Sequence, residues 1–353
     1  MSDPSLASAL CGDARTVFDE LQQLGLCFNR DGEQYQALRP LGASYPRVVS
    51  IGNETGAAAL KKLRELLNGQ VTELAGTRAV RLLTSGGRVC GALALDQRKK
   101  EWLTLPARAV ILACGGFCGV YPMSTNKRGS GGDGVAMAYE VGAKLCDMEF
   151  IQFEPSGAVW PSSLVGTSMI TTLFFEGAVL RNRSGERFML RYGEDGERVG
   201  KDVLARRIAE EIAAGQGTEH GGVYFDATGV GAERLKRDYA MYVERYGRVG
   251  IDLSAQPIEL APMPHTSLGG VRIDADGRTT VEGLFACGEV TGGLHGANRI
   301  GGSAGLETFV FGRRAGRSAA QYAKNAPEIT PKTETIAYGE ASIASKLTAL
   351  RET

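Results

Sequence analysis

The beginning of the chain shows apolar positions at helical spacing. They follow an Asp3–Pro4 pair, which is typical of a helix N-terminus, and they predict an N-terminal helix. The apolar positions are Leu6, Leu10, Val17, Leu21 and Leu24. Similar spacing predicts further helices over 57–68, 202–214 and 231–245.

Shorter apolar runs between these helices predict strands. Three of these runs lie around 70–74, 79–84 and 88–95. A fourth, RAVILACGG at 108–116, is a continuous apolar run that ends in glycines, as expected of a buried parallel strand. Because helical and strand patterns are mixed along the chain, we expect an α/β fold.

The segment 262–316 carries the densest pattern of polar and glycine positions. Its predicted elements are a polar turn at His265–Ser267, a Gly269–Gly270 pivot with a short strand, a β-turn at Ala275–Gly277, an apolar strand at Leu284–Ala286, and a helix opening near Ser303 after a Gly-rich loop. A glycine-rich entry to a helix lets backbone N–H groups approach an anionic or ring-shaped ligand, and the helix dipole favours negative charge there. We therefore expect a ligand at this loop.

Composition narrows the function class only slightly. The chain has 353 residues, enough for two domains, and 48 of them are glycine, as expected of loops that approach a large cofactor closely. Its 40 basic and 40 acidic residues cancel, so nothing indicates binding to nucleic acid or to an anionic membrane surface. There is no run of 18 apolar residues and no signal-peptide pattern, so we expect no membrane span.

The cysteines indicate a reducing compartment. Seven are scattered along the chain, an odd number that favours reduced thiols and a cytoplasmic location. Cys114 and Cys118 have C-x3-C spacing, but they flank a Gly-Gly turn and have no companion pair. We interpret them as core or loop thiols and predict no metal site.

Several glycine-anchored blocks follow one another along most of the chain. They are YPRVV followed by ETG (45–56), ARAVILACGGFCGVYPMSTNKRGSGGDG (107–134), MEFIQFEP (148–155), EGAVLRNRSGERFM (176–189) and the segment 262–316. In these blocks the sequence resembles the fumarate reductase/succinate dehydrogenase flavoprotein superfamily, which includes L-aspartate oxidase and soluble flavocytochrome fumarate reductases.

The resemblance implies an incomplete Rossmann-like FAD-binding domain with an inserted α+β capping domain. It places the first part of the FAD-binding domain at 1–153 and the capping or substrate domain at 154–262. The FAD-binding domain returns at 263–322, and a polar, partly helical tail follows at 323–353.

The family's opening unit is not found in these residues. That unit is a strand, a G-x-G-x-x-G turn and a helix, and it holds the FAD pyrophosphate. Three explanations stay open: an assigned start that is too late, a second polypeptide that supplies the unit, or a decayed flavoprotein. The implied cofactor is FAD, bound non-covalently and weakly.

One half of the family's substrate site is present. In the family, a carboxylate-bearing substrate lies over the flavin, and a hydride passes between flavin N5 and a substrate carbon. By resemblance, His265 and Arg299 form a carboxylate clamp, in which the arginine offers a planar fork of donors. The alternatives are a turn role for His265 and a structural salt bridge for Arg299. His295 would support the loop or contact the flavin.

The other half is replaced. Glu154 in QFEPS stands at the family's histidine, and Lys201 in KDVLAR stands at its proton-donating arginine. The family's Thr-Glu pair falls on Ile170 and Thr171, or on Thr171 and Thr172 with a one-residue gap, so the glutamate is absent either way. Thr171 and Lys201 are nevertheless retained as candidate catalytic residues.

These replacements argue against plain fumarate or succinate as the substrate, because Glu154 would repel a second carboxylate. Glu154 would suit a cationic or hydroxyl-bearing group instead, and Lys201 could act as an acid or a base. Alternatively, Glu154 and Lys201 pair with each other in a site without catalysis.

The cofactor contacts are implied residue by residue. Glu289 in CGEVTGG would accept hydrogen bonds from ribose hydroxyls. The other implied contacts are Gly115, Gly116, Asp133, Thr266, Ser303, Ala304 and Gly305. The alternatives are turn formation for Asp133 and helix capping for Ser303.

Two function classes follow. One is an FAD-dependent oxidoreductase acting on a small carboxylate other than plain fumarate or succinate, with an unknown electron donor. The other is a non-catalytic or cofactor-poor subunit, one half of a split flavoprotein.

Overall fold

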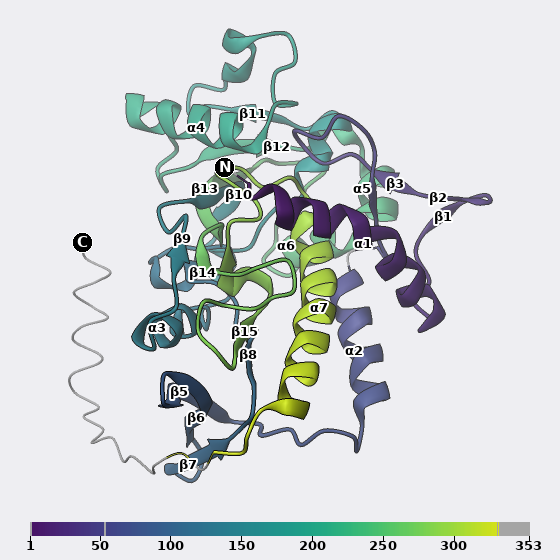
Figure 1. Ribbon diagram of the computed structural model, residues 1–353. Coiled ribbons are helices and arrows are strands. Elements are labelled where there is room, and N and C mark those ends of the chain that lie inside the picture. Colours follow the sequence, from purple (N-terminus) through teal and green to yellow (C-terminus); the bar gives the residue numbers. More distant parts are fainter. Residues whose placement is uncertain (1, 53, 330, 332–353) are drawn as a thin grey trace.

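Helices and strands alternate in the computed structural model, which describes residues 2–52, 54–329 and 331, and the predicted mixed α/β fold is confirmed (Figure 1). The helices are α1 (Pro4–Gln23), α2 (Thr55–Leu67), α3 (Asp133–Glu140), α4 (Lys201–Glu211), α5 (Ala232–Asp238), α6 (Ala240–Gly247) and α7 (Ser303–Asn325). No helix in the described part of the chain is long and apolar enough to cross a membrane.

The N-terminal helix forms as its sequence predicts. Asp3 caps α1, because its carboxylate accepts a 2.8 Å hydrogen bond from the backbone N–H of Ser5. α1 packs against α7, the long helix that runs through the middle of Figure 1. Arg313 of α7 joins the two helices through an ion pair of 2.5 Å with Glu20.

Three sheets surround α7 and α3. The first is antiparallel, in the order β5 (Thr77–Ser85), β6 (Arg88–Asp96), β7 (Glu101–Pro106). The second pairs β8 (Val110–Leu112) with β15 (Leu284–Ala286) in parallel. The third has the order β16 (Thr291–Gly292), β14 (Gly270–Arg272), β9 (Leu145–Cys146). Two short pairs are β1 (Arg30–Asp31) with β2 (Gln34–Tyr35), and β3 (Ala37–Leu38) with β4 (Val48–Val49).

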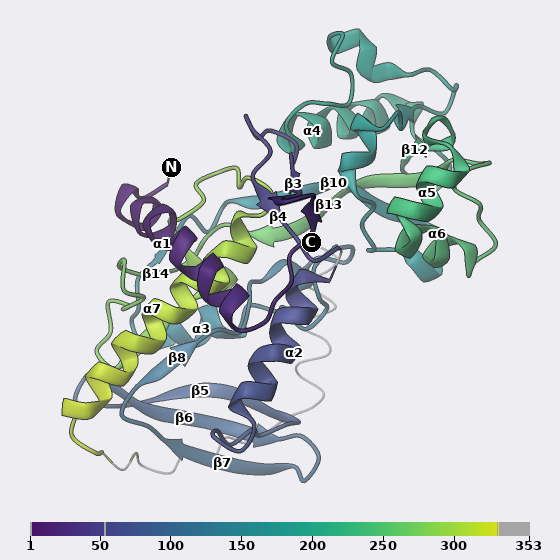
Figure 2. The ribbon, with the colours of Figure 1, turned by 90° about the vertical axis from the view of Figure 1, so that its right-hand side faces the viewer.

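The remaining sheet is four-stranded and antiparallel (Figure 2). Its order is β10 (Ile151–Trp160), β13 (Ile258–Ser267), β12 (Val223–Asp226), β11 (Val179–Arg181). Helix α4 packs against β10 and β13. This sheet has its own hydrophobic core, separate from the one around α7, so the described residues form two main cores.

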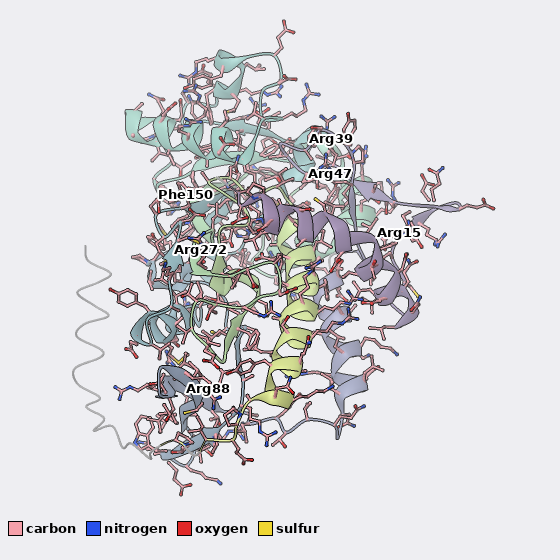
Figure 3. All side chains as sticks on the ribbon, viewed as in Figure 1. Arg15, Arg39, Arg47, Arg88, Phe150 and Arg272 are labelled. Atoms are coloured by element: carbon pink, nitrogen blue, oxygen red, sulfur yellow. The ribbon has the colours of Figure 1, made fainter. Side chains whose placement is uncertain are left out.

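The segments at either end of α7 come from distant parts of the sequence. Figure 3 shows Arg39 and Arg47, which flank β3 and β4, beside the N-terminal end of α7, and Arg88 near its other end. Arg88 fixes that other end, because it donates a 2.9 Å hydrogen bond to the carbonyl of Pro327.

Three local predictions are wrong, and several strands were not predicted. No strand forms at 70–74, because positive-φ turns at Gly69 and Gly76 bracket this stretch and leave it without a pairing partner. The helix expected over 231–245 breaks at Tyr239 into α5 and α6. His265–Ser267 ends strand β13 instead of forming a turn. The strands β7, β10, β11 and β12 were not predicted. Most of the predicted tail, residues 332–353, lies outside the described part of the chain.

Candidate active site

The predicted substrate residues meet where two strands, one helix and one loop converge. Glu154 and His265 lie on the neighbouring strands β10 and β13. Lys201 is the first residue of α4, which packs on the same pair of strands. Arg299 lies in the glycine-rich loop 293–302 that leads into α7, and its backbone carbonyl accepts a 2.8 Å hydrogen bond from Gln152 of β10. Segments that are far apart in the sequence thus form one cluster.

Glu154 and Lys201 form a buried ion pair. The Lys201 Nζ lies 2.5 Å from the Glu154 Oε2, and Glu154 is only 4% exposed. The hydroxyl of Ser156, which is also buried, donates to the other carboxylate oxygen of Glu154 at 2.9 Å. The pairing foreseen as an alternative is therefore present, and the cation beside Glu154 is Lys201 itself.

His265 is held as a neutral ring at pH 7. Its Nε2 faces Glu154 Oε2 at 4.0 Å, and its Nδ1 lies 2.8 Å from the Thr125 hydroxyl. Burial lowers the pKa of His265 to about 4, with Lys201 and Arg299 lowering it further against the opposing effect of Glu154. His265 can therefore hydrogen-bond a substrate carboxylate at pH 7, but it adds no positive charge to the clamp.

Arg299 is a largely desolvated cation without an acidic partner. No carboxylate of the described residues lies within 4.0 Å of its guanidinium, and its buried Nε has no hydrogen-bond partner there. Its Nη1 makes one long contact of 3.4 Å to the carbonyl of Ile300. Burial also lowers the pKa of Arg299. Leaving a buried guanidinium donor unpaired costs free energy, and such donors mark a position prepared for an anion.

Two polar residues in the loop before α3 support the site and were not identified from the sequence. Thr125 orients His265, as described above. Asn126 donates one 2.9 Å hydrogen bond to the backbone carbonyl of His265 and another to Glu289 Oε1. The signal available was the run of short polar residues STN within the block 107–134.

The predicted cofactor residues line the loops beside this cluster. Glu289 accepts a 3.0 Å hydrogen bond from the backbone N–H of Ser267. A Cβ on Gly116 would lie 2.0 Å from the Ser267 hydroxyl and 2.5 Å from Glu289 Oε1, so only glycine fits there. Gly115 has a φ of +81°, a conformation that also favours glycine.

The first turn of α7 is open to a ligand. Gly302, with a φ of +86°, is the N-cap, and no side chain caps the helix. Ser303 is the first helical residue, so the capping role considered for it is wrong. The first turn also lacks an acidic residue. Its backbone N–H groups at Ala304 and Gly305 lie at the N-terminal end of the helix, which attracts negative charge.

The remaining candidates have other partners or none in the cluster. Asp133 forms an ion pair of 2.6 Å with Arg78 of β5. Thr171 is buried in a short 3₁₀ turn, and its hydroxyl makes no hydrogen bond to the other described site residues. His295 Nε2 lies 2.9 Å from Glu307 of α7, which fits the predicted support of the loop. The buried hydroxyl of Thr266 lies 3.4 Å from the carbonyl of Ser267.

The unpaired polar groups and glycine loops of these elements fit FAD. The side chains of the described residues do not fit a metal ion. The uncapped helix start can meet the electron-rich edge of a flavin, and the glycine loops allow close approach. Among the described residues, no group of three His, Cys, Asp or Glu side chains is placed to hold a metal ion.

Comparison with known proteins gives a consistent family. A protein family described as "FAD binding domain" matches residues 1–304. The chain is 40% identical over 325 residues to a subunit of the fumarate reductase (CoM/CoB) of Methanothermobacter marburgensis, covering 92% of this chain and 59% of that protein. It is 36% identical to L-aspartate oxidase of Pseudomonas aeruginosa, covering 93% of this chain and 63% of that protein. The chain thus spans about three fifths of the length of these relatives.

Solved structures agree with the sequence comparison. A mutant of FrdA from E. coli quinol fumarate reductase matches with a TM-score of 0.86 at 27% identity, over 99% of this chain and 61% of that chain.

Proposed function

The chain belongs to the fumarate reductase/succinate dehydrogenase flavoprotein superfamily, and on that basis we propose that it is the substrate-binding part of an FAD-dependent oxidoreductase. The proposed substrate is a small carboxylate other than plain fumarate or succinate. The observation that carries this proposal is Arg299, a desolvated cation without an acidic partner in the described residues, placed beside His265 and the uncapped start of α7.

Arg299 and His265 bind and orient the substrate. The guanidinium can take a carboxylate in a bidentate contact, which fixes both the position and the plane of that group. Neutral His265, held by Thr125, adds one hydrogen bond. Orientation of this kind lowers the barrier of the reaction because less entropy is lost on reaching the transition state.

Lys201 is the proposed proton carrier. Its Nζ holds a proton beside Glu154, inside the cluster that contains Arg299 and His265. A bound, reduced FAD would supply a hydride to one carbon of the substrate double bond, and Lys201 would give a proton to the next carbon; the reverse reaction would remove both. Glu154 positions the Lys201 ammonium group inside the cluster, where it can transfer a proton.

The other proposed contacts serve the cofactor. Glu289, already held by Ser267 and Asn126, has remaining acceptor capacity for hydroxyl groups. The first turn of α7 would stabilise negative charge on the flavin ring. Gly115, Gly116 and Thr266 would border the same ring.

The central parallel sheet offers a place for the pyrophosphate-binding unit. In the described residues, β8 pairs only with β15, and Ile111 on β8 is 40% exposed. Parallel strands are normally buried between neighbours, so this edge suits one more strand. We propose that a strand–G-x-G-x-x-G–helix unit, from a segment outside these 353 residues, pairs with β8 and completes a Rossmann-like FAD-binding domain. The domain boundaries at 153, 262 and 322 are part of this proposal.

The alternative function is a non-catalytic or cofactor-poor half of a split flavoprotein. The observation that favours it is the Glu154–Lys201 pair, which satisfies both groups without a substrate. In that case the open edge of β8 would serve assembly alone.

Absorption spectra and turnover assays distinguish the two functions. The purified chain is expected to carry little flavin by itself and to become yellow when produced with a polypeptide that contains the opening unit. The yellow complex is then tested for oxidation of reduced viologen with a panel of unsaturated acids. Flavin binding without turnover of any acid would favour the alternative. Stoichiometric flavin in the chain alone would disprove the need for the opening unit.

A further inference from the structure

One cation of the site is paired with a carboxylate and the other is not, and this difference restricts the charge of the substrate. Lys201 is neutralised by Glu154 at 2.5 Å, and both groups are largely buried, with 16% and 5% of their side chains exposed. Besides Glu154 and Lys201, the charged group of the described residues that shifts the pKa of His265 is Arg299. Among the described residues of this cluster, Arg299 is therefore the one cation that is not already paired.

The groups around Glu154 leave little freedom to rearrange. One carboxylate oxygen takes the lysine, and the other lies 2.9 Å from the hydroxyl of Ser156, whose single proton it shares with the backbone carbonyl of Met169 at 2.6 Å. The histidine on the neighbouring strand is held by Thr125 from its far side. The negative charge of Glu154 is thus fixed in place by contacts from β10, α4 and β13.

A substrate with two carboxylates does not match this arrangement. The first would pair with Arg299. The second would have to share Lys201 with Glu154, which places two carboxylates around one ammonium group in a largely desolvated site, where like charges repel strongly. A substrate with an ammonium group fares no better, because Lys201 already occupies the position beside Glu154.

We infer that the substrate carries a single carboxylate and no second charged group. The carboxylate binds Arg299, and the uncharged far end, for example an ester, amide, hydroxyl or apolar group, lies against the Glu154–Lys201 pair. For a reduction, the substrate is a monoanionic α,β-unsaturated acid. This inference rests on the proposed function, and it adds the charge class of the substrate.

The decisive comparison uses two ligands that differ by one charge. At pH 7, fumarate is a dianion and monomethyl fumarate a monoanion with the same double bond. Both are titrated into the flavin-loaded complex, and binding is followed by calorimetry and by the change in flavin absorbance. The rate of oxidation of reduced viologen is measured in parallel. L-Aspartate serves as a third ligand, since it carries an ammonium group. Monomethyl fumarate is expected to bind about 100-fold more tightly than fumarate or aspartate.

A variant of Glu154 tests the cause of the preference. Glu154→Gln removes the fixed negative charge and frees Lys201 for a second carboxylate, so the preference for the monoester is expected to fall to about tenfold or less. Glu197→Gln is the matched control, because Glu197 is also buried but pairs with Arg187, which lies outside the cluster. The control variant is expected to keep the wild-type preference.

The outcomes separate this inference from the proposed function. Equal or tighter binding of fumarate or aspartate by the wild-type complex would overturn the inference and leave the oxidoreductase in place. An unchanged preference in Glu154→Gln would overturn the role given to the Glu154–Lys201 pair. If the complex binds none of these acids and reduces none, the carboxylate site itself fails, and the proposed function falls with the inference. The wild-type comparison does not depend on the folding of any variant.

Discussion

Replacing Arg299 by alanine is the sharpest test of the site, because this residue has a proposed function but no acidic partner among the described residues. Its guanidinium has no ion pair in the described residues, and its buried Nε has no hydrogen-bond partner. The substitution therefore removes only the long 3.4 Å contact to the carbonyl of Ile300 from the protein itself. We expect the midpoint of thermal unfolding to stay unchanged or to rise, as is common when a desolvated functional charge is removed.

The effect on catalysis should be large. Hydrogen bonds to charged groups contribute about 1.5–3 kcal/mol each, so losing both bonds of a bidentate contact to the substrate carboxylate costs about 3–6 kcal/mol. At about 1.4 kcal/mol per tenfold change, kcat/KM should fall by roughly two to four orders of magnitude.

Two arginines of α7 provide the controls. Arg317→Ala removes an exposed arginine without an ion pair in the described residues and should change neither quantity. Arg313→Ala breaks the contact with Glu20 that joins α7 to α1, and it should lower the unfolding midpoint by about 2–4 °C with little loss of activity.

The assay measures kcat/KM and thermal unfolding for the wild type and the three variants, each as the complex with matched flavin content. Loss of activity without loss of stability is expected only for Arg299→Ala. A destabilised Arg299→Ala, or losses of activity equal to those of Arg317→Ala, would show that Arg299 is structural and that the site is placed wrongly.

Three further predictions follow from the same groups. Fumarate should be reduced more slowly than about 10 per second by the flavin-loaded complex, because Glu154 and Lys201 replace one clamp and the proton relay; assays with reduced viologen check this, and faster turnover would contradict it. Acid should destabilise the wild type more than His265→Asn, because the ring takes up a proton near pH 6.5 in the unfolded chain and only near pH 4 in the folded chain. Up to about 3 kcal/mol of unfolding free energy should therefore be lost as the pH falls from 6.5 to 4. Parallel urea titrations of both proteins measure this loss, and equal losses would show that the ring is not buried. Thr125→Val should move that His265 transition and lower kcat/KM, as seen by NMR titration of the ring and by kinetics, whereas an unmoved transition would leave Thr125 without a role.

The sequence by itself determined the elements that rest on local chemistry. Asp3 followed by Pro4 and apolar residues at helical spacing is sufficient for α1, because capping and spacing act within one helix. The strand at Leu284–Ala286 and the helix from Ser303 follow in the same way from an apolar run and a glycine loop. The family was also evident from the sequence, since its motifs lie in continuous blocks.

Only the tertiary structure decided which charged side chains pair with one another. Glu154 and Lys201 are 47 positions apart, and their pairing depends on α4 packing against β10. The absence of an acidic partner for Arg299 within the described residues depends on the whole surroundings of its loop. The break at Tyr239 likewise arises where this residue packs on the hydrophobic core of the four-stranded sheet. Charge and spacing along a chain give the kinds of groups present, but the free energy of each charge depends on its neighbours in space and on its burial, which only the fold supplies.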